Sequence, residues 1–585
     1  MYKTTINAFL LSILSFGALN AQENDAFEYK PRPKEFENFE FRNDSVFAKR
    51  AVVEDYNGRV FESKLPYPMI FIHGLNSSSD TWNASLNYFD SQYGYTYGGR
   101  FDFCLNADGN NATTNKNFYP TPGADIAAFE ASVINGDYYL VNFNVKVDGS
   151  WGTNVLSNQA AVAKQGAALK KAIERVLQIT GKDKVVLVGH SMGGLCSREY
   201  IQNPSNWQAD GAHHVAKLLT VGTPHGGSNA SDSGLGWFAG IDTRSEAIRD
   251  LKETYYYSGD DGRFLFGGVE VADNNNNMDE HAGDPDFYNI DVNCNGVIGD
   301  NIVGLNQKPI DNLIDFSSVI GRITNWLGSN ITTDGVVEEP QSRMNYYYPS
   351  LTYPTKVFLF NSGYDTLENH TELPGYYYQL MQGLDEPNFK ELAYTVLTNK
   401  AYNGYTTVQE NSSSADHDYY KFTVSDDVNA TVMISSIVTS SMNATILDSS
   451  GTAVGAVQNN SGASLNFTRS LAPGNYFLKI TSTTPTNTNY QTPYVFSITS
   501  TLSATENIAS AVRFYPNPVK DVLYLDNFKA AGASIYSVLG QLLDVVTLDA
   551  SATTSSIDMS GYANGIYMIT LTNETQQQTI KVIKE

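Results

Sequence analysis

The chain has 585 residues, of which 62 are acidic and 38 basic, and its formal net charge is −24. At roughly 150 residues per domain, this length predicts three or four compact units. The excess of negative charge repels nucleic acid and anionic lipid headgroups, so we expect no nucleic-acid partner.

The N-terminal segment, residues 1–21, combines a single lysine with an apolar run and small residues before Gln22. This pattern predicts a secretory signal peptide, because the apolar run is too short to span a membrane. No other stretch is long and apolar enough to do so, and we expect no transmembrane segment. Residues 22–64 are charged and weakly periodic, which predicts an extended N-terminal arm.

Residues 65–385 alternate apolar runs with segments of helical periodicity. The runs YPMIFIHG, DYYLVNFNV, KVVLVG and VAKLLTVGT predict strands, and NQAAVAKQGAALKKAIERVLQIT predicts a helix. Continuous apolar strands separated by helices indicate a parallel sheet that is covered on both faces. The predicted fold class is therefore α/β, with a doubly wound sheet.

A long insertion, residues 228–330, interrupts this pattern and shows no clear strand. A connection of that length inside a compact domain usually has a function. We therefore predict a lid over an active site.

Two Asn- and Asp-rich segments of the insertion space their side-chain oxygens as an EF-hand calcium loop does. Met278 stands where the first loop needs glycine, and the second loop ends in Ile302 instead of a carboxylate. A solvated surface loop explains the same composition, so both interpretations stay open. Calcium would order the lid, and catalysis itself would need no cofactor. The candidate ligands are Asp273, Asn275, Asn277, Asp284, Asp291, Asn293 and Asn295.

Two small all-β domains are predicted after the α/β domain, at residues 398–502 and 506–585. Apolar and polar residues alternate in YYKFTV and NYFLKI, between turns rich in Gly, Asn and Ser, which indicates a β-sandwich. Through SADHDYYKFTV and LAPGNYFLKITS, this region resembles the bacterial pre-peptidase C-terminal domain.

The last segment contains VRFYPNPVKDVLYLDN, ASIYSVLGQLL and GIYMITLTNETQQQTIKVIKE, in that order. These blocks resemble the C-terminal sorting domain of the type IX secretion system. The resemblance implies a protein that passes through the periplasm and outer membrane and is secreted or held at the cell surface. The secretion machinery is then an implied partner.

The stretch KVVLVGHSMGGLCSREYIQ places Ser191 at the centre of a Gly-x-Ser-x-Gly pattern, between a predicted strand and a predicted helix. The pattern alone is weak evidence, and this context gives it weight. A sharp strand-to-helix turn exposes the hydroxyl, and the helix N-terminus directs N–H groups at developing negative charge. Gly189 and Gly193 are expected where side chains would collide in the turn.

A second segment, MIFIHGLNSSSDTW, ends a predicted strand at His73 and Gly74. In this arrangement the backbone N–H groups of Leu75 and Met192 would form an oxyanion hole. With VGTPHGGS after the next strand, residues 66–385 resemble the α/β-hydrolase lipases and esterases.

On that fold the triad follows the chain order serine, acid, histidine. The stretch NITTDGVVEEPQS resembles the acid loop of the family, which implies Asp334 as the orienting carboxylate. Only His370 and His417 follow it, and His417 lies in the predicted sandwich, so His370 is the predicted base. Asp365 is the rival acid, but it lacks the DGVV context. The histidines predicted to be structural are His73, His190 and His225.

Three cysteines occur in the chain. Cys196 lies one turn into the helix after Ser191, where a buried thiol is expected. That leaves Cys104 and Cys294 as a candidate disulfide, which an exported protein can form.

The sequence thus predicts a secreted serine carboxylic ester hydrolase of lipase or esterase type. It would act through an acyl-enzyme at Ser191, on an acyl lipid or a small ester. An amidase or acyltransferase uses the same triad, and a non-catalytic cell-surface adhesin would use the fold only as a scaffold. The presence of all three triad residues in fold order favours an enzyme.

Overall fold

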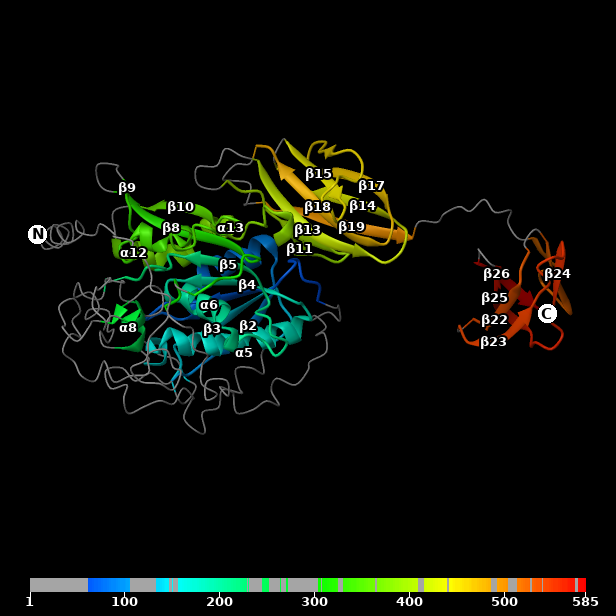
Figure 1. Ribbon diagram of the computed structural model, residues 1–585, viewed down its shortest axis with the longest axis horizontal. Coiled ribbons are helices and arrows are strands. Elements are labelled where there is room, and N and C mark those ends of the chain that lie inside the picture. The colour runs from blue at the N-terminus through cyan, green and yellow to red at the C-terminus, as the bar shows by residue number, and fades with distance from the viewer. Residues whose placement is uncertain are drawn as a thin grey trace, which may run out of the picture. The chain divides into compact units, whose positions relative to one another are not determined.

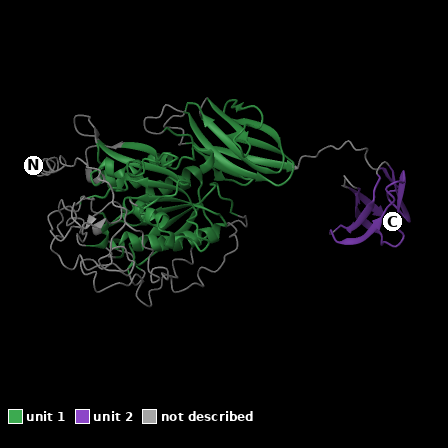
Figure 2. Cartoon of the chain, viewed as in Figure 1, with its two compact units in different colours: residues 1–501 green, residues 502–585 purple. Residues whose placement is uncertain are grey.

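The computed structural model of the chain describes most residues from 61 onward. The described residues are 61–105, 133–146, 150, 156–228, 230, 245–251, 263–264, 270–271, 304–306, 308–324, 330–362, 366–408, 415–438, 441–484, 492–502, 513–526, 529–538, 540–573 and 577–585. The predicted signal peptide, most of the arm, Cys294 and all seven candidate calcium ligands lie outside them. The chain forms two compact units, residues 1–501 and residues 502–585 (Figure 2).

The first unit contains a parallel β-sheet, and every pair of neighbours along its main path is parallel (Figure 1). A short strand, β9 (Asn330–Ile331), adds to β8 in the antiparallel sense. The predicted doubly wound α/β class is confirmed. In spatial order the strands are β10 (Lys356–Ser362), β8 (Asp315–Thr324), β5 (Val215–Val221), β4 (Val185–His190), β1 (Met69–Ile72), β3 (Tyr138–Asn142) and β2 (Tyr97–Asp102).

Both faces of this sheet are covered, as the continuous apolar strands require. Successive side chains of a strand point to opposite faces. In β1, Met69 and Phe71 join one buried core, and Ile70 and Ile72 join the other. All four side chains are at most 3% exposed, so neither face of the strand meets solvent.

Helices supply the covering residues on each face. Side chains of α5 (Val162–Thr180), α6 (Met192–Gln202) and α8 (Glu246–Leu251) belong to the core that contains Ile70. Side chains of α3 (Asn83–Tyr88) and α13 (Tyr377–Gly383) belong to the core that contains Phe71. Shorter elements are η1 (Ser79–Trp82), η2 (Phe89–Tyr93), η3 (Leu156–Gln159), η4 (Pro204–Asn206), α10 (Glu339–Ser342), α11 (Met344–Tyr347), α12 (Thr366–Glu372), η7 (Leu373–Gly375), η8 (Lys390–Leu392), β6 (Arg263–Phe264) and β7 (Glu270–Val271).

The expectation that residues 228–330 contain no strand is wrong at their C-terminal end. Strand β8 lies there and fills the sheet between β5 and β10. Its sequence, DFSSVIGRIT, carries Ser, Gly and Arg in place of a continuous apolar run. A side chain at Gly321 would place its Cβ 2.8 Å from the Cβ of Asp334, so a small residue is needed there.

Helix α8, also within the predicted insertion, caps the N-terminus of α5. The Glu246 carboxylate accepts the Ala161 N–H at 2.8 Å, and the Asp250 carboxylate accepts the Val162 N–H at 2.9 Å. Glu246 also forms an ion pair with Lys164 at 2.8 Å. The first N–H groups of a helix lack partners within it and attract negative charge, so this part of the insertion is fixed to the core.

A β-sandwich follows in the same unit, and its buried residues alternate as the sequence predicts. Tyr420, Phe422 and Val424 are buried along one strand. One sheet has the order β11 (Tyr394–Thr395), β13 (Asp416–Val424), β18 (Gly474–Ser482), β15 (Met442–Leu447), β16 (Gln458–Asn459). The other has the order β12 (Ala401–Gly404), β19 (Tyr494–Leu502), β14 (Val428–Ser435), β17 (Leu465–Leu471).

The sandwich shares a buried core with one face of the parallel sheet. The hydroxyl groups of Tyr95 and Tyr405 are hydrogen-bonded, and the Thr395 N–H donates to the Tyr67 hydroxyl at 3.0 Å. The rings of Tyr67 and Tyr394 pack edge to face, with their centroids 5.3 Å apart. The parallel sheet and the sandwich therefore form one packed body.

The second unit is all-β, as predicted, and has a buried core of its own. One sheet has the order β20 (Arg513–Tyr515), β21 (Val522–Asp526), β24 (Thr554–Asp558). The other has the order β23 (Leu542–Thr547), β22 (Gly532–Ser537), β25 (Gly565–Thr572), β26 (Gln577–Lys584). In the part of the chain that the structure describes, no helix has both the length and the apolar character needed to cross a membrane.

Because of the shared core, two C-terminal truncations should differ in their effect on the melting temperature. Ending the chain at residue 501 removes only the second unit and should leave the melting temperature of the first unit unchanged. Ending the chain at residue 393 removes the sandwich and exposes apolar surface around Tyr67 and Tyr95. The cooperative melting transition should then be lost, or its temperature should fall strongly. Circular dichroism on both chains tests this, and equal melting temperatures would contradict a shared core.

Candidate active site

Ser191 forms a strained turn between β4 and α6. Its backbone has φ 52° and ψ −126°, a region that costs a residue with a side chain about 1–3 kcal/mol. The Ser191 N–H donates to the Val221 carbonyl at 2.9 Å, which ties the turn to β5. The strand, turn and helix that the sequence predicts around this serine are all present.

The glycines on either side of Ser191 are required by close backbone contacts, as predicted. A Cβ on Gly189 would lie 2.5 Å from the backbone nitrogen of Gly194. A Cβ on Gly193 would lie 2.4 Å from the carbonyl oxygen of Ile72, at the end of β1. Any larger residue at these positions would push β1, the turn and α6 apart.

The predicted acid and base are paired and buried. Nδ1 of His370, on α12, lies 2.6 Å from Oδ2 of Asp334. The other carboxylate oxygen of Asp334 accepts the N–H groups of Val336 at 3.0 Å and Val337 at 2.8 Å. An ionised carboxylate only accepts, so Nδ1 carries the imidazole proton and Nε2 is the nitrogen left for proton transfer.

Gly222, the residue after β5, brings the serine turn and the acid–base pair together. Its φ is +55°, and a Cβ there would lie 3.0 Å from Asp334 Oδ2 and 3.3 Å from His370 Nδ1. His190, next to the serine, donates from Nε2 to the His370 carbonyl at 2.9 Å. No hydrogen bond joins Ser191 Oγ to His370 Nε2 among the described residues; this contact often tightens only with substrate bound.

The two N–H groups predicted for the oxyanion hole belong to segments that meet at the serine. A Cβ on Gly74 would lie 2.7 Å from Ser191 Cβ and 3.3 Å from Ser191 Oγ, so the loop after β1 packs against Ser191. Leu75 follows in that loop, and Met192 is the first residue of α6.

The three histidines that the sequence predicts to be structural are kept neutral by burial. Burial lowers the pKa of His73 to about 4 and holds those of His190 and His225 well below their usual value. The guanidinium of Arg198, 3.1 Å from Nδ1 of His225, adds to the effect there. These residues are structural, as predicted.

The remaining sequence candidates lie away from the serine or outside the described residues. His417, on β13, is half-buried and contacts Thr481 in the sandwich. Cys196 is a buried thiol, as expected, 2.8 Å from the side-chain oxygen of Gln165. Asp365, the alternative candidate for the acid, lies outside the described residues. Cys104 is buried, and its pairing with Cys294 stays a prediction.

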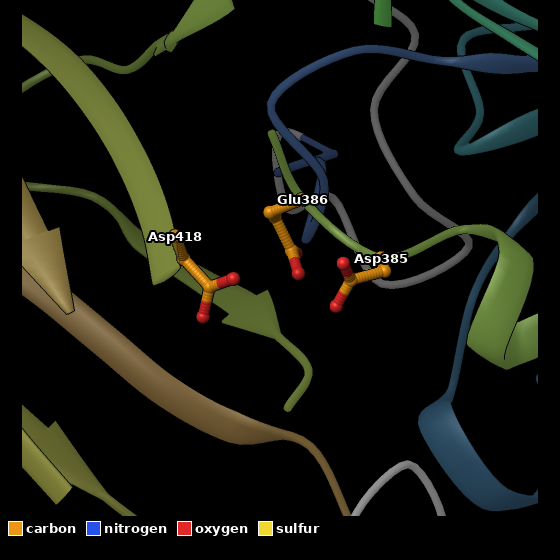
Figure 3. Close-up of side chains that lie close together, drawn as sticks. All are labelled: Asp385, Glu386 and Asp418. Carbon is orange, nitrogen blue, oxygen red and sulfur yellow. The ribbon is translucent and has the colours of Figure 1, made fainter. Parts of the chain in front are cut away.

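A second group of polar residues lies between the parallel sheet and the sandwich. The sequence did not predict this group. The carboxylates of Asp385, Glu386 and Asp418 point toward one another (Figure 3), with one oxygen of each within 4.8 Å of the others. Each residue is at most 4% exposed. These are the described residues whose geometry could hold a metal ion. No local motif marks them, because two precede the sandwich and one lies on β13.

Two lysines of the parallel sheet neutralise part of this carboxylate cluster. Lys356 Nζ lies 3.1 Å from Asp385 and 3.2 Å from Asp315, and Lys217 Nζ lies 2.6 Å from Asp315. Burial raises the pKa of Glu386 to about 8. Burial, reinforced by neighbouring carboxylates, also raises the pKa values of Asp416 and Asp418. The acids outnumber the lysines, so part of the cluster holds protons near neutral pH.

A strained serine between a parallel strand and a helix, beside a buried Asp–His pair, defines the α/β-hydrolase fold. Family comparison agrees: residues 66–254 match the model of the PGAP1-like alpha/beta domain. Residues 513–585 match the model of the secretion system C-terminal sorting domain. The predicted sorting domain is thus confirmed, and it indicates a secreted or cell-surface protein.

Curated relatives match a short part of the chain. Triacylglycerol lipases of Pseudarthrobacter phenanthrenivorans and Burkholderia plantarii are each 43% identical to it over 68 residues, which is 12% of this chain. The match spans 19% of the first relative and 17% of the second, less than a fifth of either protein.

Solved structures resemble separate parts of the chain. A mature lipase from Bacillus licheniformis is 17% identical, with a TM-score of 0.24, over 53% of this chain and 86% of that one. The pre-peptidase C-terminal domain of a collagenase from Bacillus anthracis is 16% identical, with a TM-score of 0.15, over 18% of this chain and 91% of that one.

The carboxylate cluster predicts how stability depends on pH. In the folded protein Glu386 keeps its proton up to about pH 8. In the unfolded chain the same carboxyl group loses its proton near pH 4.5. The folded state therefore binds more protons between these values, and the free energy of unfolding falls as pH rises through this window. Glu386→Gln mimics the protonated acid and should reduce that slope by up to about 1.4 kcal/mol per pH unit.

Urea unfolding at pH 5, 6, 7 and 8 measures this slope for the wild type and the variant. Glu391→Gln, an exposed exchange five residues further along, is the matched control and should leave the slope unchanged. An identical slope in wild type and Glu386→Gln would show that Glu386 does not hold its proton.

Proposed function

We propose that the protein is a serine hydrolase that cleaves carboxylic esters of the lipase or esterase class. The observation that carries this proposal is the strained turn at Ser191 beside the buried Asp334–His370 pair, with Gly222 against both partners. The matched segment of two triacylglycerol lipases supports an acyl-lipid or similar ester as substrate. The sorting domain supports a site of action outside the cytoplasm.

In the proposed mechanism His370 Nε2 accepts the Ser191 hydroxyl proton as Oγ attacks the ester carbonyl carbon. The carbonyl oxygen becomes an oxyanion, which the Leu75 and Met192 N–H groups stabilise. Collapse of this intermediate breaks the ester bond, and His370 returns the proton to the departing alcohol. Water then attacks the acyl-enzyme in the same way, releasing the acid and restoring Ser191.

Asp334 orients the base in this scheme and stabilises the imidazolium that forms. Its bond to Nδ1 selects the tautomer in which Nε2 is free to accept a proton. The N–H groups of Val336 and Val337 hold the carboxylate in place, so it cannot turn away from the histidine.

Replacing the nucleophile tests the proposal directly. Ser191→Ala should remove nearly all turnover of p-nitrophenyl esters from short to long acyl chains, and it should not react with an organophosphonate probe that labels the wild type. The melting temperature should not fall, because the exchange leaves the backbone unchanged. Substantial ester turnover in the folded variant would overturn Ser191 as nucleophile. If the wild type reacts with the organophosphonate probe but cleaves only amides, the protein is an amidase.

Replacing the acid tests the orienting role. Asp334→Asn keeps the shape but lets the amide hold the wrong histidine tautomer, so kcat should fall on the order of 10³-fold or more. Hydrolysis at saturating ester concentration measures the effect. A fall of less than tenfold in a folded variant would contradict the assignment of Asp334.

A further inference from the structure

The N–H group of Leu75 belongs to the same peptide unit as the carbonyl group of Gly74. A trans peptide unit is planar, so its C=O and N–H point in opposite directions. Any contact that fixes the Gly74 carbonyl therefore also fixes the direction of the Leu75 N–H. If this peptide rotated, the N–H would leave the oxyanion and the hole would lose one of its two donors.

Asn158 holds this loop from both sides. It lies in η3, directly before α5, and is 1% exposed. Its side-chain nitrogen donates to the Gly74 carbonyl at 3.3 Å, and its side-chain oxygen accepts the N–H of Asn76. Asn76 has φ 50°, in the left-handed region that asparagine tolerates better than most residues with a side chain.

His73 supplies a second donor to the same carbonyl. Its Nε2 lies 2.9 Å from the backbone nitrogen of Phe143, which can only donate, so Nε2 accepts and Nδ1 carries the proton. Nδ1 then donates to the Gly74 carbonyl at 2.8 Å. The 3.4 Å approach of Asn158 nitrogen to the same Nδ1 joins two donors and is not a hydrogen bond.

From this geometry we infer that Asn158 is a positioning residue for the oxyanion hole, acting through the Gly74–Leu75 peptide. Among the described residues it forms no hydrogen bond with Ser191 or His370. Two donors on one carbonyl fix the plane of the peptide, and they also polarise it, which makes the Leu75 N–H a stronger donor. The inference rests on the proposed function, because it assigns a role within the same acyl transfer.

Two exchanges at Asn158 separate its two hydrogen bonds. Asn158→Leu removes both while keeping the branched shape of the side chain. Asn158→Asp keeps the acceptor for the Asn76 N–H but places a carboxylate oxygen against the Gly74 carbonyl, where the two oxygens repel. Asn203→Leu is the matched control, because Asn203 is equally buried and also both donates and accepts, but does so at the far end of α6.

The measurements are kcat and KM for a p-nitrophenyl ester, the inhibition constant of a trifluoromethyl ketone, and the melting temperature. The ketone reacts with the serine to form an oxyanion, so its affinity reports the hole directly. Loss of a whole oxyanion donor costs about 10²- to 10³-fold in kcat, so a displaced donor should cost about 10- to 100-fold.

Both Asn158 variants should lose kcat and ketone affinity in parallel, while KM stays within about twofold of the wild type. The Asn203 variant should lose neither, whatever its melting temperature. A merely structural role would lower the melting temperature and leave kcat and ketone affinity of the folded protein unchanged, and that result in either Asn158 variant would overturn the inference. If Asn158→Leu does not fold, the nearly isosteric Asn158→Asp decides the question.

Failure of the inference and failure of the proposed function give different results. If the wild type shows no Ser191-dependent ester cleavage, the proposed function itself is contradicted. A wild type that cleaves esters, with Asn158 variants that cleave them equally fast, would leave the function standing and remove only the role of Asn158.

Discussion

The close approach of the end of β1 to the first turn of α6 is the constraint on which the site depends. With no side chain on Gly193, the start of the helix rests against the carbonyls of Ile72 and His73. The same approach brings Gly74 against Ser191 and fixes the serine backbone in its strained conformation. Ser191, the helix N-terminus and the loop after β1 are therefore placed by one packing contact, and later segments of the chain add the Asp334–His370 pair.

The elements that the sequence predicts correctly are those with a local signal. β1, β3, β4 and β5 are continuous apolar runs, and the Gly-x-Ser-x-Gly turn is a contiguous pattern with a steric cause. β8 was not predicted, because the strand beside Asp334 must carry a small residue at Gly321 and also contains Ser and Arg. The pairing of Asp334 with His370 followed from chain order within a resemblance, whereas its geometry needed three dimensions.

The carboxylate cluster had no local signal at all, because its members come from both sides of the boundary between hydrolase and sandwich. Lys217 and Lys356 lie on strands of the parallel sheet, and Asp418 lies on β13. Buried charges require partners. Lys356 has its ion-pair partners, Asp315 and Asp385, before the sandwich begins, and β13 adds the carboxylates of Asp416 and Asp418. The sandwich is therefore more than an appended module, because its strand β13 supplies Asp416 and Asp418 to the same buried group of charges.

The two proposed oxyanion donors differ in how their direction is set. The Met192 N–H begins α6, so the geometry of a regular helix orients it. The Leu75 N–H lies in a loop, where no ladder of backbone hydrogen bonds holds the peptide plane. A loop donor with fixed direction needs side chains from elsewhere to supply that restraint. Asn158 and His73, two buried polar residues that donate to the Gly74 carbonyl, supply this restraint, and a sequence pattern centred on Ser191 does not reveal Asn158.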